Sequence, residues 1–489
     1  MGIITRQAIQ STIYSYAGAF LGFLTVWFMN RLWLTPEQNG LLNVIISISL
    51  VTSSLSNLGF GGVTMRMFPQ FRDPQTRHGG FLFYPLLFTA IGSLLFVGAF
   101  ILFKDAYITR NATNASLLNE HIYFLLPLTF FLGIFNVLDV FARSIYVSTA
   151  GIIVKEIALR VVILAAAMGY HFGYLSFDTF VLLYFSSFCA IAIAMVVILY
   201  RKGEWHWRIP QAKLSLEKRR EMRNVALFSV ITGLSGMLIS TIDKIIVNDM
   251  LGLAAAGVFS VATYFGSMIQ IPARSVMRIS STIIAESWKT HDMENIAQVY
   301  RKSALNQFII GLFLLLGLWV TMDALLSLMP TEYSAARNVI LFMGLGYLID
   351  LATGANGIII ATSKFYRYDT WFMLVLVVFT FVTNIALIPI YGITGAGIAS
   401  CLTFALFNSA RLIFIYMKFG IQPFTPAFLK IAAIGTFSAG VAYWIPPINN
   451  GYGDILLRGG AFSLVFGALV LWTGVSPDIN AVLRKLQKR

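Results

Sequence analysis

Long apolar stretches separated by short polar breaks recur along the whole chain. The stretches at 81–100 (FLFYPLLFTAIGSLLFVGAF) and 180–200 (FVLLYFSSFCAIAIAMVVILY) are apolar on every side, whereas a membrane β-strand alternates apolar and polar residues over about ten positions. A helix needs about 20 predominantly apolar residues to cross the hydrocarbon core of a bilayer. The pattern therefore predicts an all-α integral membrane protein with about fourteen transmembrane helices.

A charged stretch over 201–224 divides the predicted helices into six and eight. The helices lie at 9–29, 40–61, 81–103, 122–142, 151–169, 179–200, 225–247, 251–271, 305–328, 339–361, 370–388, 393–416, 428–445 and 455–473. The charged stretch is a basic linker between an N-terminal six-helix lobe over 1–200 and a C-terminal six-helix lobe over 225–420. The remaining residues, 421–489, hold two further helices and a basic tail.

Composition and charge fit a chain that lies mostly in lipid. Of its 489 residues, 58% are hydrophobic and 11% are charged, against roughly 25% charged in soluble domains. If the N-terminus lies inside, 26 of the 35 Lys and Arg residues fall on the cytoplasmic side and 6 on the opposite side. Because Lys and Arg accumulate in short cytoplasmic loops, we expect both termini in the cytoplasm. This topology accounts for the net charge of +14, which makes nucleic-acid binding the weaker interpretation.

Two pairs of segments suggest an internal repeat. LDVFARSIYVSTA and IDLATGANGIIIATS each precede the fifth helix of their half, and they place Asp139 in register with Asp350. A second pair of segments places Gly40 opposite Gly257. An even number of helices in each half gives both copies the same membrane orientation, related by an axis along the membrane normal. The sequence therefore predicts two parallel bundles with the substrate path between them.

Six segments spread over the chain resemble a known superfamily. They are RQAIQSTIYSYAGAFLGFL, LTPEQNGLLNV, STIDKIIVNDMLGLAAAGVFSVATY, IAESWKTHDMENIAQVYRKSA, LIDLATGANGIIIATSKFYRYDT and IPIYGITGAGIAS. Through them the chain resembles, essentially end to end, the multidrug/oligosaccharidyl-lipid/polysaccharide flippase superfamily. The similarity is greatest to its polysaccharide transporter branch, which includes O-antigen flippases.

The resemblance implies two six-helix lobes around a central cavity, with two extra C-terminal helices. It also implies transfer of an undecaprenyl-diphosphate-linked oligosaccharide from the inner to the outer leaflet of the bacterial inner membrane, in polysaccharide or O-antigen biosynthesis. The implied partners are this lipid-linked substrate, the bilayer, H⁺ or Na⁺ as a coupling ion, and the glycan polymerase machinery.

Charged residues inside predicted spans are candidates for function, because an unpaired charge that faces lipid is costly. Glu156 and Arg160 lie four residues apart in one predicted helix, and this spacing places them on one face. A guanidinium at this depth can bind phosphate or sugar through two parallel hydrogen bonds, with Glu156 tuning it. The alternative interpretation is an ion pair that only stabilises the lobe. Lys155 is expected to extend to the membrane surface, and Arg411 is a further cation within a span.

Asp350 is the main candidate for ion coupling. It lies near the centre of the span predicted over 339–361, and Asn356 follows almost two turns later, so a carboxylate and an amide lie at depth. A carboxyl group that moves between buried and hydrated surroundings can exchange a proton or bind Na⁺. The alternative interpretation is a permanent pair with a cation on another helix. Asn356 is also a candidate for substrate binding.

Three further candidates lie nearer the membrane surfaces. Asp139 lies four residues before Arg143, which predicts a local ion pair. Asp243 and Lys244, towards the outer end of their helix, form either a gate between the lobes or, as is more common, a solvated pair at the interface. Arg66 lies in a loop at the predicted cytoplasmic mouth, where it can meet an incoming diphosphate, although the cytoplasmic bias of basic residues explains it as well.

Other functional classes have less support. The sequence has no nucleophile motif, no Walker loop and no cluster of metal ligands, so it predicts no enzyme and no cofactor. A multidrug or cation antiporter of the same fold is one alternative, and it should favour acidic residues over arginine in its cavity. A membrane glycan polymerase or ligase is another, but such enzymes carry a long outer loop, and the longest one predicted here spans only 104–121.

Overall fold

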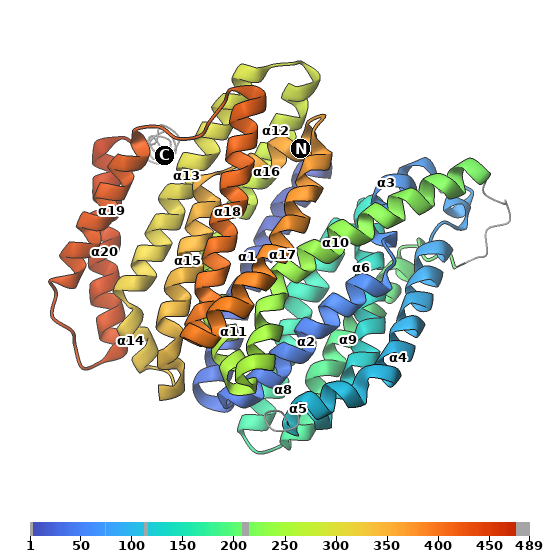
Figure 1. The fold of residues 1–489 in the computed structure, drawn as a ribbon, viewed down its shortest axis with the longest axis horizontal. Helices are drawn as coiled ribbons and strands as arrows, with labels where there is room; N and C mark the ends of the chain where they lie inside the picture. The colour runs from blue at the N-terminus through green and yellow to red at the C-terminus, as the bar shows by residue number, and fades with distance from the viewer. Residues whose placement is uncertain (1–2, 74, 112–115, 208–214, 476–489) are drawn as a thin grey trace. The chain divides into compact units, whose positions relative to one another are not determined.

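The structure is a computed structural model, and it describes residues 3–73, 75–111, 116–207 and 215–475. Within these ranges it contains helices and no β-strand, which confirms the predicted all-α fold (Figure 1). The chain forms two compact units, Met1–Gly257 (unit 1) and Val258–Arg489 (unit 2). The division into lobes over 1–200 and 225–420 stays a prediction.

Unit 1 extends from α1 to the start of α11. Its elements are α1 (Ile3–Phe28), η1 (Met29–Trp33), α2 (Pro36–Ser56), α3 (Phe60–Met67), η2 (Phe68–Gln70), η3 (Arg77–Gly80), α4 (Phe83–Asn111), α5 (Ser116–His121), η4 (Ile122–Phe124), α6 (Leu125–Ser144), α7 (Ser148–Ile152), η5 (Ile153–Ala158), α8 (Leu159–His171), α9 (Phe177–Arg201), α10 (Leu216–Leu251) and the beginning of α11 (Leu253–Ser267). The helix α2 packs against α4, α6 and α10, and α6 also packs against α9 (Figure 1). The short elements η1 and η5 are π-helical turns.

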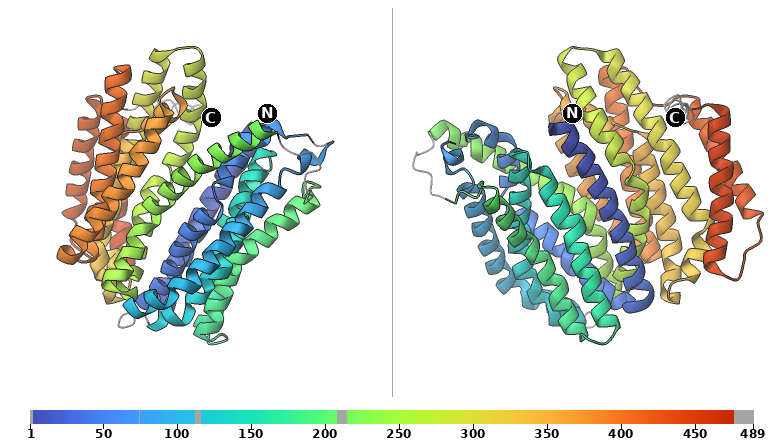
Figure 2. Two further views of the ribbon diagram at one scale, coloured as in Figure 1. Left: turned by 45° about the vertical axis from the view of Figure 1, so that its right-hand side comes forward. Right: turned by 180° about the vertical axis from the view of Figure 1, so that it is seen from behind.

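Unit 2 contains the rest of the chain. Its elements after α11 are η6 (Met268–Gln270), α12 (Ala273–Lys289), α13 (Met293–Val320), α14 (Met322–Ser327), η7 (Thr331–Ala335), α15 (Ala336–Ala352), α16 (Asn356–Thr362), α17 (Tyr366–Tyr391), α18 (Ile393–Phe419), α19 (Ala427–Tyr443) and α20 (Gly451–Thr473). The helix α15 packs against α13 and α18, and α18 packs against α17. The helices α19 and α20 form a hairpin that packs against α13 (Figure 2).

Each of the fourteen predicted spans corresponds to one or more helices in the structure, although turns interrupt some of them, as at 57–59 and 353–355. Eleven helices in the described ranges are long and apolar enough to cross a membrane. The other three predicted spans correspond to α1, to the run from α7 to α8, which η5 interrupts, and to α19, which has 17 residues. Two expectations were wrong in detail. The helix predicted over 225–247 begins at Leu216, and the sequence pattern missed α12 altogether.

The two glycines that the repeat pairs, Gly40 and Gly257, lie against each other in unit 1. A Cβ atom added to Gly40 would collide with the carbonyl oxygen of Leu253, and one added to Gly257 would collide with that of Pro36. The side-chain amide of Asn39 donates a hydrogen bond of 3.1 Å to the carbonyl oxygen of Gly257. The parallel repeat stays a prediction.

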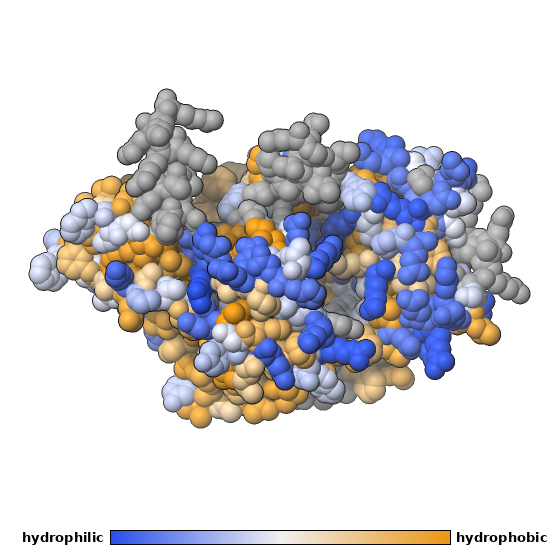
Figure 3. Space-filling model, turned by 90° about the horizontal axis from the view of Figure 1, so that it is seen from above, coloured by the Kyte–Doolittle hydropathy of each residue, from blue (hydrophilic) through white to orange (hydrophobic). Residues whose placement is uncertain are grey.

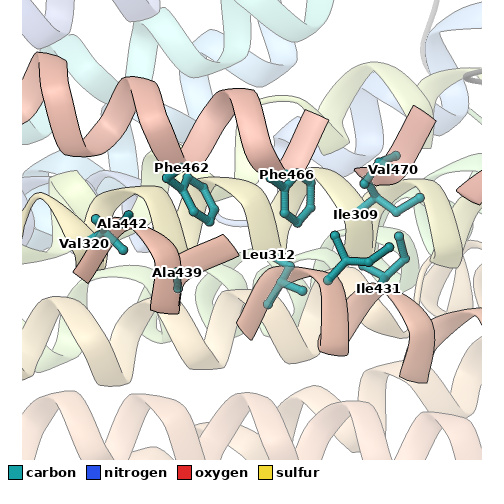
Figure 4. Close-up of a cluster of buried hydrophobic side chains, with 10 residues drawn as sticks. Ile309, Leu312, Val320, Ile431, Ala439, Ala442, Phe462, Phe466 and Val470 are labelled. Atoms are coloured by element: carbon teal, nitrogen blue, oxygen red, sulfur yellow. The ribbon is translucent and has the colours of Figure 1, made fainter. Parts of the chain in front are cut away.

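A buried apolar cluster holds the C-terminal hairpin to α13. It contains Ile309, Leu312, Val320, Ile431, Ile434, Ala439, Ala442, Phe462, Phe466 and Val470, each at most 9% exposed. Figure 4 shows Phe462 and Phe466 pointing to the same side of α20, toward the side chains from α13 and α19. Burying a large apolar side chain stabilises a fold by about 1.5–3 kcal/mol, although a helix in lipid gains less from it than one in water.

The turn between α19 and α20 is fixed by a buried ion pair. The Nε and Nη2 atoms of Arg458 donate hydrogen bonds of 3.1 and 2.8 Å to the carbonyl oxygen of Ile445. Arg458 also lies 3.3 Å from Asp454, whose carboxylate accepts a hydrogen bond from the backbone N–H of Ile448. Both charged residues are at most 7% exposed. Arg458 thus serves as a structural contact within α20.

Candidate functional site

The span predicted over 339–361 is broken in the structure. The helix α15 ends at Ala352, and α16 begins at Asn356. Between them Gly354 has a φ angle of +57°, a conformation that is costly for a residue with a side chain. A Cβ atom on Gly354 would also lie 2.8 Å from three atoms of Ala304 on α13. The expectation of one continuous helix was therefore wrong, and the break lies next to Asp350.

The carboxylate of Asp350 is held by two side-chain amides from other elements. Gln270, the last residue of η6, donates a hydrogen bond of 3.0 Å from Nε2 to Oδ2 of Asp350. Asn408 of α18 donates one of 3.1 Å from Nδ2 to Oδ1. Asp350 itself is partly buried. We call Asp350, Gln270, Asn408, Thr353 and Asn356 the carboxylate cage.

The remaining members of the carboxylate cage connect it to the helix break. The Nδ2 atom of Asn356 lies 2.8 Å from Oδ1 of Asn408 and 3.0 Å from the hydroxyl oxygen of Thr353. The Thr353 hydroxyl lies 2.9 Å from Oδ1 of Asn408. All three side chains are at most 4% exposed. The structure thus brings Asp350 and Asn356 into one network through Asn408, and adds three polar residues that sequence reasoning did not select.

A second buried pair lies beside the carboxylate cage. Arg411 of α18 donates two hydrogen bonds, from Nε at 2.9 Å and from Nη2 at 2.6 Å, to Oδ1 of Asp369 at the start of α17. Its guanidinium carbon lies 3.8 Å from the centre of the Phe407 ring. Gly357 also lies against the guanidinium, since a Cβ atom added to Gly357 would lie 2.8 Å from Nη1 of Arg411. Arg411 thus donates these hydrogen bonds to Asp369, although it also interacts electrostatically with Asp350. The alternative of a permanent cation partner for Asp350 stays a prediction.

In unit 1, Glu156 and Arg160 form the predicted contact. The Nη2 atom of Arg160 lies 2.8 Å from Oε2 of Glu156, and the two side chains are 27% and 30% exposed. Glu156 lies in the π-helical turn η5, against α1: a Cβ atom on Gly18 would lie 2.6 Å from Cβ of Glu156. Lys155 is exposed, as expected. The ion pair is present, and the substrate role of Arg160 stays a prediction.

Asp139 differs from its repeat partner Asp350. It forms the expected ion pair with Arg143, with 3.0 Å between Nη2 and Oδ2. The residue four positions after Asp350 is Gly354 rather than a basic residue. The carboxylate of unit 1 therefore has a cation on its own helix, whereas the carboxylate of unit 2 has amides from other elements.

The other predicted residues have separate environments. Asp243 is only 8% exposed, so the expectation of a solvated pair with Lys244 was wrong for this carboxylate. Arg66 is exposed in the last turn of α3, so the expectation that it lies in a loop was wrong. The same end of unit 1 carries Arg72, whose guanidinium carbon lies 4.0 Å from the centre of the Tyr146 ring. Figure 3 shows hydrophilic side chains gathered over this end. In the described ranges, no three His, Cys, Asp or Glu side chains come together as metal ligands.

Polar residues in apolar spans were the signal that sequence reasoning did not use. Arg411 and Asn408 lie three residues apart in the predicted span over 393–416, so they share a helix face. Gln270 lies at the end of another predicted span, and Asp369 lies one residue before a third. Their partners are 42 to 80 positions away in the sequence, so spacing alone does not reveal the pairs.

Comparisons with known proteins identify the family and the fold. The family model for polysaccharide biosynthesis proteins matches residues 4–278, more than half of the chain. The fold is similar to the solved structure of the lipid II flippase MurJ in an inward closed conformation, with a TM-score of 0.74, 11% identity, and coverage of 94% of this chain and 98% of that one. No curated protein sequence matches the chain.

The fold also resembles transporters of another branch. A multidrug resistance MATE family transporter of the MOP superfamily, inward-facing, matches with a TM-score of 0.60, 14% identity, and coverage of 86% of this chain and 98% of that one. An outward-facing structure matches with a TM-score of 0.51, 12% identity, and coverage of 86% and 95%. The chain therefore belongs to the polysaccharide biosynthesis protein family, and its fold is similar to that of a lipid II flippase and of MATE family transporters.

Proposed function

We propose that the protein is a flippase that moves undecaprenyl-diphosphate-linked oligosaccharide repeat units from the inner to the outer leaflet of the bacterial cytoplasmic membrane, for polysaccharide or O-antigen biosynthesis. The observation that carries the proposal is the family match over residues 4–278. The likeness to a lipid II flippase supports a fold that is suited to lipid-linked substrates. Both termini lie in the cytoplasm, and the glycan polymerase machinery receives the product.

Arg160 is the proposed contact for the diphosphate or the sugar. Its contact with Glu156 uses only Nη2, so Nε and Nη1 remain for a ligand, and the side chain is 27% exposed. Arg411, by contrast, is 8% exposed and already donates two hydrogen bonds to Asp369. A guanidinium binds phosphate oxygens best through two parallel N–H groups, which Arg160 still has. Arg66 is the proposed first contact at the cytoplasmic mouth, and Asn356 stays a candidate for the substrate.

Asp350 is the proposed coupling residue. A buried carboxylate without its own cation binds a proton or Na⁺ at a lower cost than one that is already paired. Asp350 is partly buried, its two side-chain hydrogen-bond donors are neutral amides, and the nearby Arg411 donates its hydrogen bonds to Asp369. Asp243, 8% exposed on α10, is the second candidate. Alternating access of the two lobes then exposes these carboxylates to each side of the membrane in turn.

Deletion of the gene in its host, followed by complementation, tests the proposal. We expect loss of surface glycan and accumulation of lipid-linked repeat units on the cytoplasmic face, restored by the wild type but not by Arg160→Ala or Asp350→Asn. Arg337→Ala and Asp323→Asn are matched controls, because these residues form an ion pair that is 42% and 59% exposed. Both controls should restore the glycan, since exposed pairs contribute about 0–1 kcal/mol.

A multidrug or cation antiporter is the second candidate, and the likeness to MATE family transporters favours it. In that case the deletion strain would keep its surface glycan and its lipid-linked pool unchanged. Its sensitivity to toxic cations would rise instead. That result would exclude the flippase.

A further inference from the structure

The two amides that hold Asp350 are not equivalent. We propose that the side-chain amide of Asn408 keeps its orientation in the carboxylate cage. The amide of Gln270 instead flips, exchanging its nitrogen and oxygen, and a monovalent cation then binds at Oδ2 of Asp350. This inference rests on the proposed coupling role of Asp350. It adds a positioning residue, Asn408, and a cation-binding residue, Gln270, to that role.

Asn408 cannot turn over without losing its hydrogen bonds. Its Nδ2 group donates to Asp350 and to the carbonyl oxygen of Phe404 at 3.0 Å, which uses both protons. Its Oδ1 atom faces the amide of Asn356 and the hydroxyl of Thr353. A reversed amide would place oxygen against two acceptors and nitrogen against a donor, and such a buried mismatch is costly. The orientation of Asn408, and with it Oδ1 of Asp350, is therefore fixed.

Gln270 is free to turn over. Its side chain makes one hydrogen bond, to Asp350, and the residue is only partly buried. It lies in the short 3₁₀ turn η6 rather than in the packed face of a long helix. Reversing this amide replaces the N–H that faces Asp350 with the oxygen Oε1 and, among the described residues, breaks no other side-chain hydrogen bond. Gln270 is thus the member of the carboxylate cage that changes its hydrogen-bond role at the lowest cost.

A bound cation requires this reversal. An ionised carboxylate only accepts hydrogen bonds, and two N–H donors satisfy it as observed. Once water delivers a proton to Oδ2, the new O–H needs an acceptor, and the N–H of Gln270 is the wrong partner. A Na⁺ ion likewise needs oxygen ligands and is repelled by an N–H. With Gln270 reversed, Oε1 and Oδ2 together accept the O–H or coordinate the ion.

The charged surroundings leave the carboxylate cage open to a cation. The helix α15 packs against α13, α18, η6 and η7. Among the described residues, Arg411 of α18 is the charged group that interacts electrostatically with Asp350, and its two donated hydrogen bonds go to Asp369. Asp350, Arg411 and Asp369 thus carry a net charge of −1, which one monovalent cation would neutralise.

Thermal unfolding of the purified full-length protein tests the inference. A cation that binds the folded state raises Tm by mass action. We would titrate Na⁺ at fixed pH, with N-methylglucamine keeping the ionic strength constant, and separately titrate pH without Na⁺. These two series distinguish Na⁺ from the proton. The Tm of the wild type should rise with the concentration of either Na⁺ or protons and then level off. The concentration that gives half of the full rise is the half-saturating concentration.

Substitutions at Gln270 should move this concentration in opposite directions. Gln270→Leu removes the oxygen ligand and should raise it by about tenfold or more, whereas Gln270→Glu adds a second carboxylate and should lower it by about tenfold or more. Asp350→Asn should abolish the response. Thr403→Val is the matched control, because this buried hydroxyl on α18 bonds Thr380 at 3.2 Å and should leave the response unchanged.

Three results would overturn the inference. In the first, the Tm of the wild type responds to neither cation. In the second, both Gln270 variants keep the half-saturating concentration of the wild type. In the third, the Tm of Asp350→Asn responds as fully as that of the wild type. Because the measurement involves no transport, it tests cation binding independently of flippase activity. A protein that binds the cation as described but leaves the host's glycan unchanged would refute only the proposed function.

Discussion

Arg411 illustrates how the neighbours of one charge decide what that charge can do. Its guanidinium is stacked on Phe407, bonded twice to Asp369 and 8% exposed. Arg160 makes a single contact and is 27% exposed. The two arginines have the same chemistry, but Arg411 is committed to the structure and Arg160 is available to a ligand.

Breaking the Arg411 pair should destabilise the fold. Arg411→Met leaves the carboxylate of Asp369 buried without its cation, which costs about 3–5 kcal/mol. The double substitution Arg411→Met with Asp369→Leu should recover most of that loss, because two apolar side chains replace both ions. Thermal unfolding of the purified variants measures both effects. Arg337→Met, in an exposed pair, is the control and should cost less than about 1 kcal/mol. A double variant as unstable as the single one would show that this account of Arg411 is wrong.

The break between α15 and α16 is the feature at the scale of elements that creates the candidate site. A continuous helix would have no residue with a positive φ angle at position 354 and would give Asn356 a different direction. With the break, Thr353 and Asn356 both reach Asn408, and Asn408 reaches Asp350. The geometry of the carboxylate cage therefore depends on one glycine that has a positive φ angle.

Gly354→Ala should destabilise the protein and weaken the cation response of the carboxylate cage. The φ angle of +57° costs a residue with a side chain about 1–2 kcal/mol, and contact with Ala304 adds to this. Gly440→Ala is the matched control, because it lies within α19 with no atom within 4 Å of an added Cβ. It should stabilise by about 0.5–1 kcal/mol. Thermal unfolding compares the two, and equal stability of both variants would contradict the role of Gly354.

For the whole molecule, the apolar pattern was enough to predict the helices, because lipid requires every backbone group of a spanning segment to be bonded within it. It was also enough to predict the contacts within one helix, such as Asp139 with Arg143 and Glu156 with Arg160. The pattern did not reveal the break at Gly354, since the apolar residues on both sides of it were interpreted as one span over 339–361. It missed α12 because the apolar residues of this helix are interspersed with polar ones.

The contacts between helices could not be derived from spacing. Gln270 meets Asp350 across 80 positions, and Arg411 meets Asp369 across 42. The contact of Gly40 with Gly257 was not predicted either, since the internal repeat only paired these positions as equivalent. Long-range partners therefore require the fold.

Translocation in a reconstituted membrane tests the central claim most directly. Purified protein would be inserted into liposomes that contain an undecaprenyl-diphosphate-linked oligosaccharide, and a glycosidase that cannot cross the bilayer would be added outside. With wild-type protein, the lipid-linked oligosaccharide of the inner leaflet should become accessible to the glycosidase. Arg160→Ala and Asp350→Asn should lower the rate of this process by about tenfold or more, which corresponds to about 1.4 kcal/mol on the activation barrier. A protected pool that stays as large with wild-type protein as in protein-free liposomes would contradict the flippase.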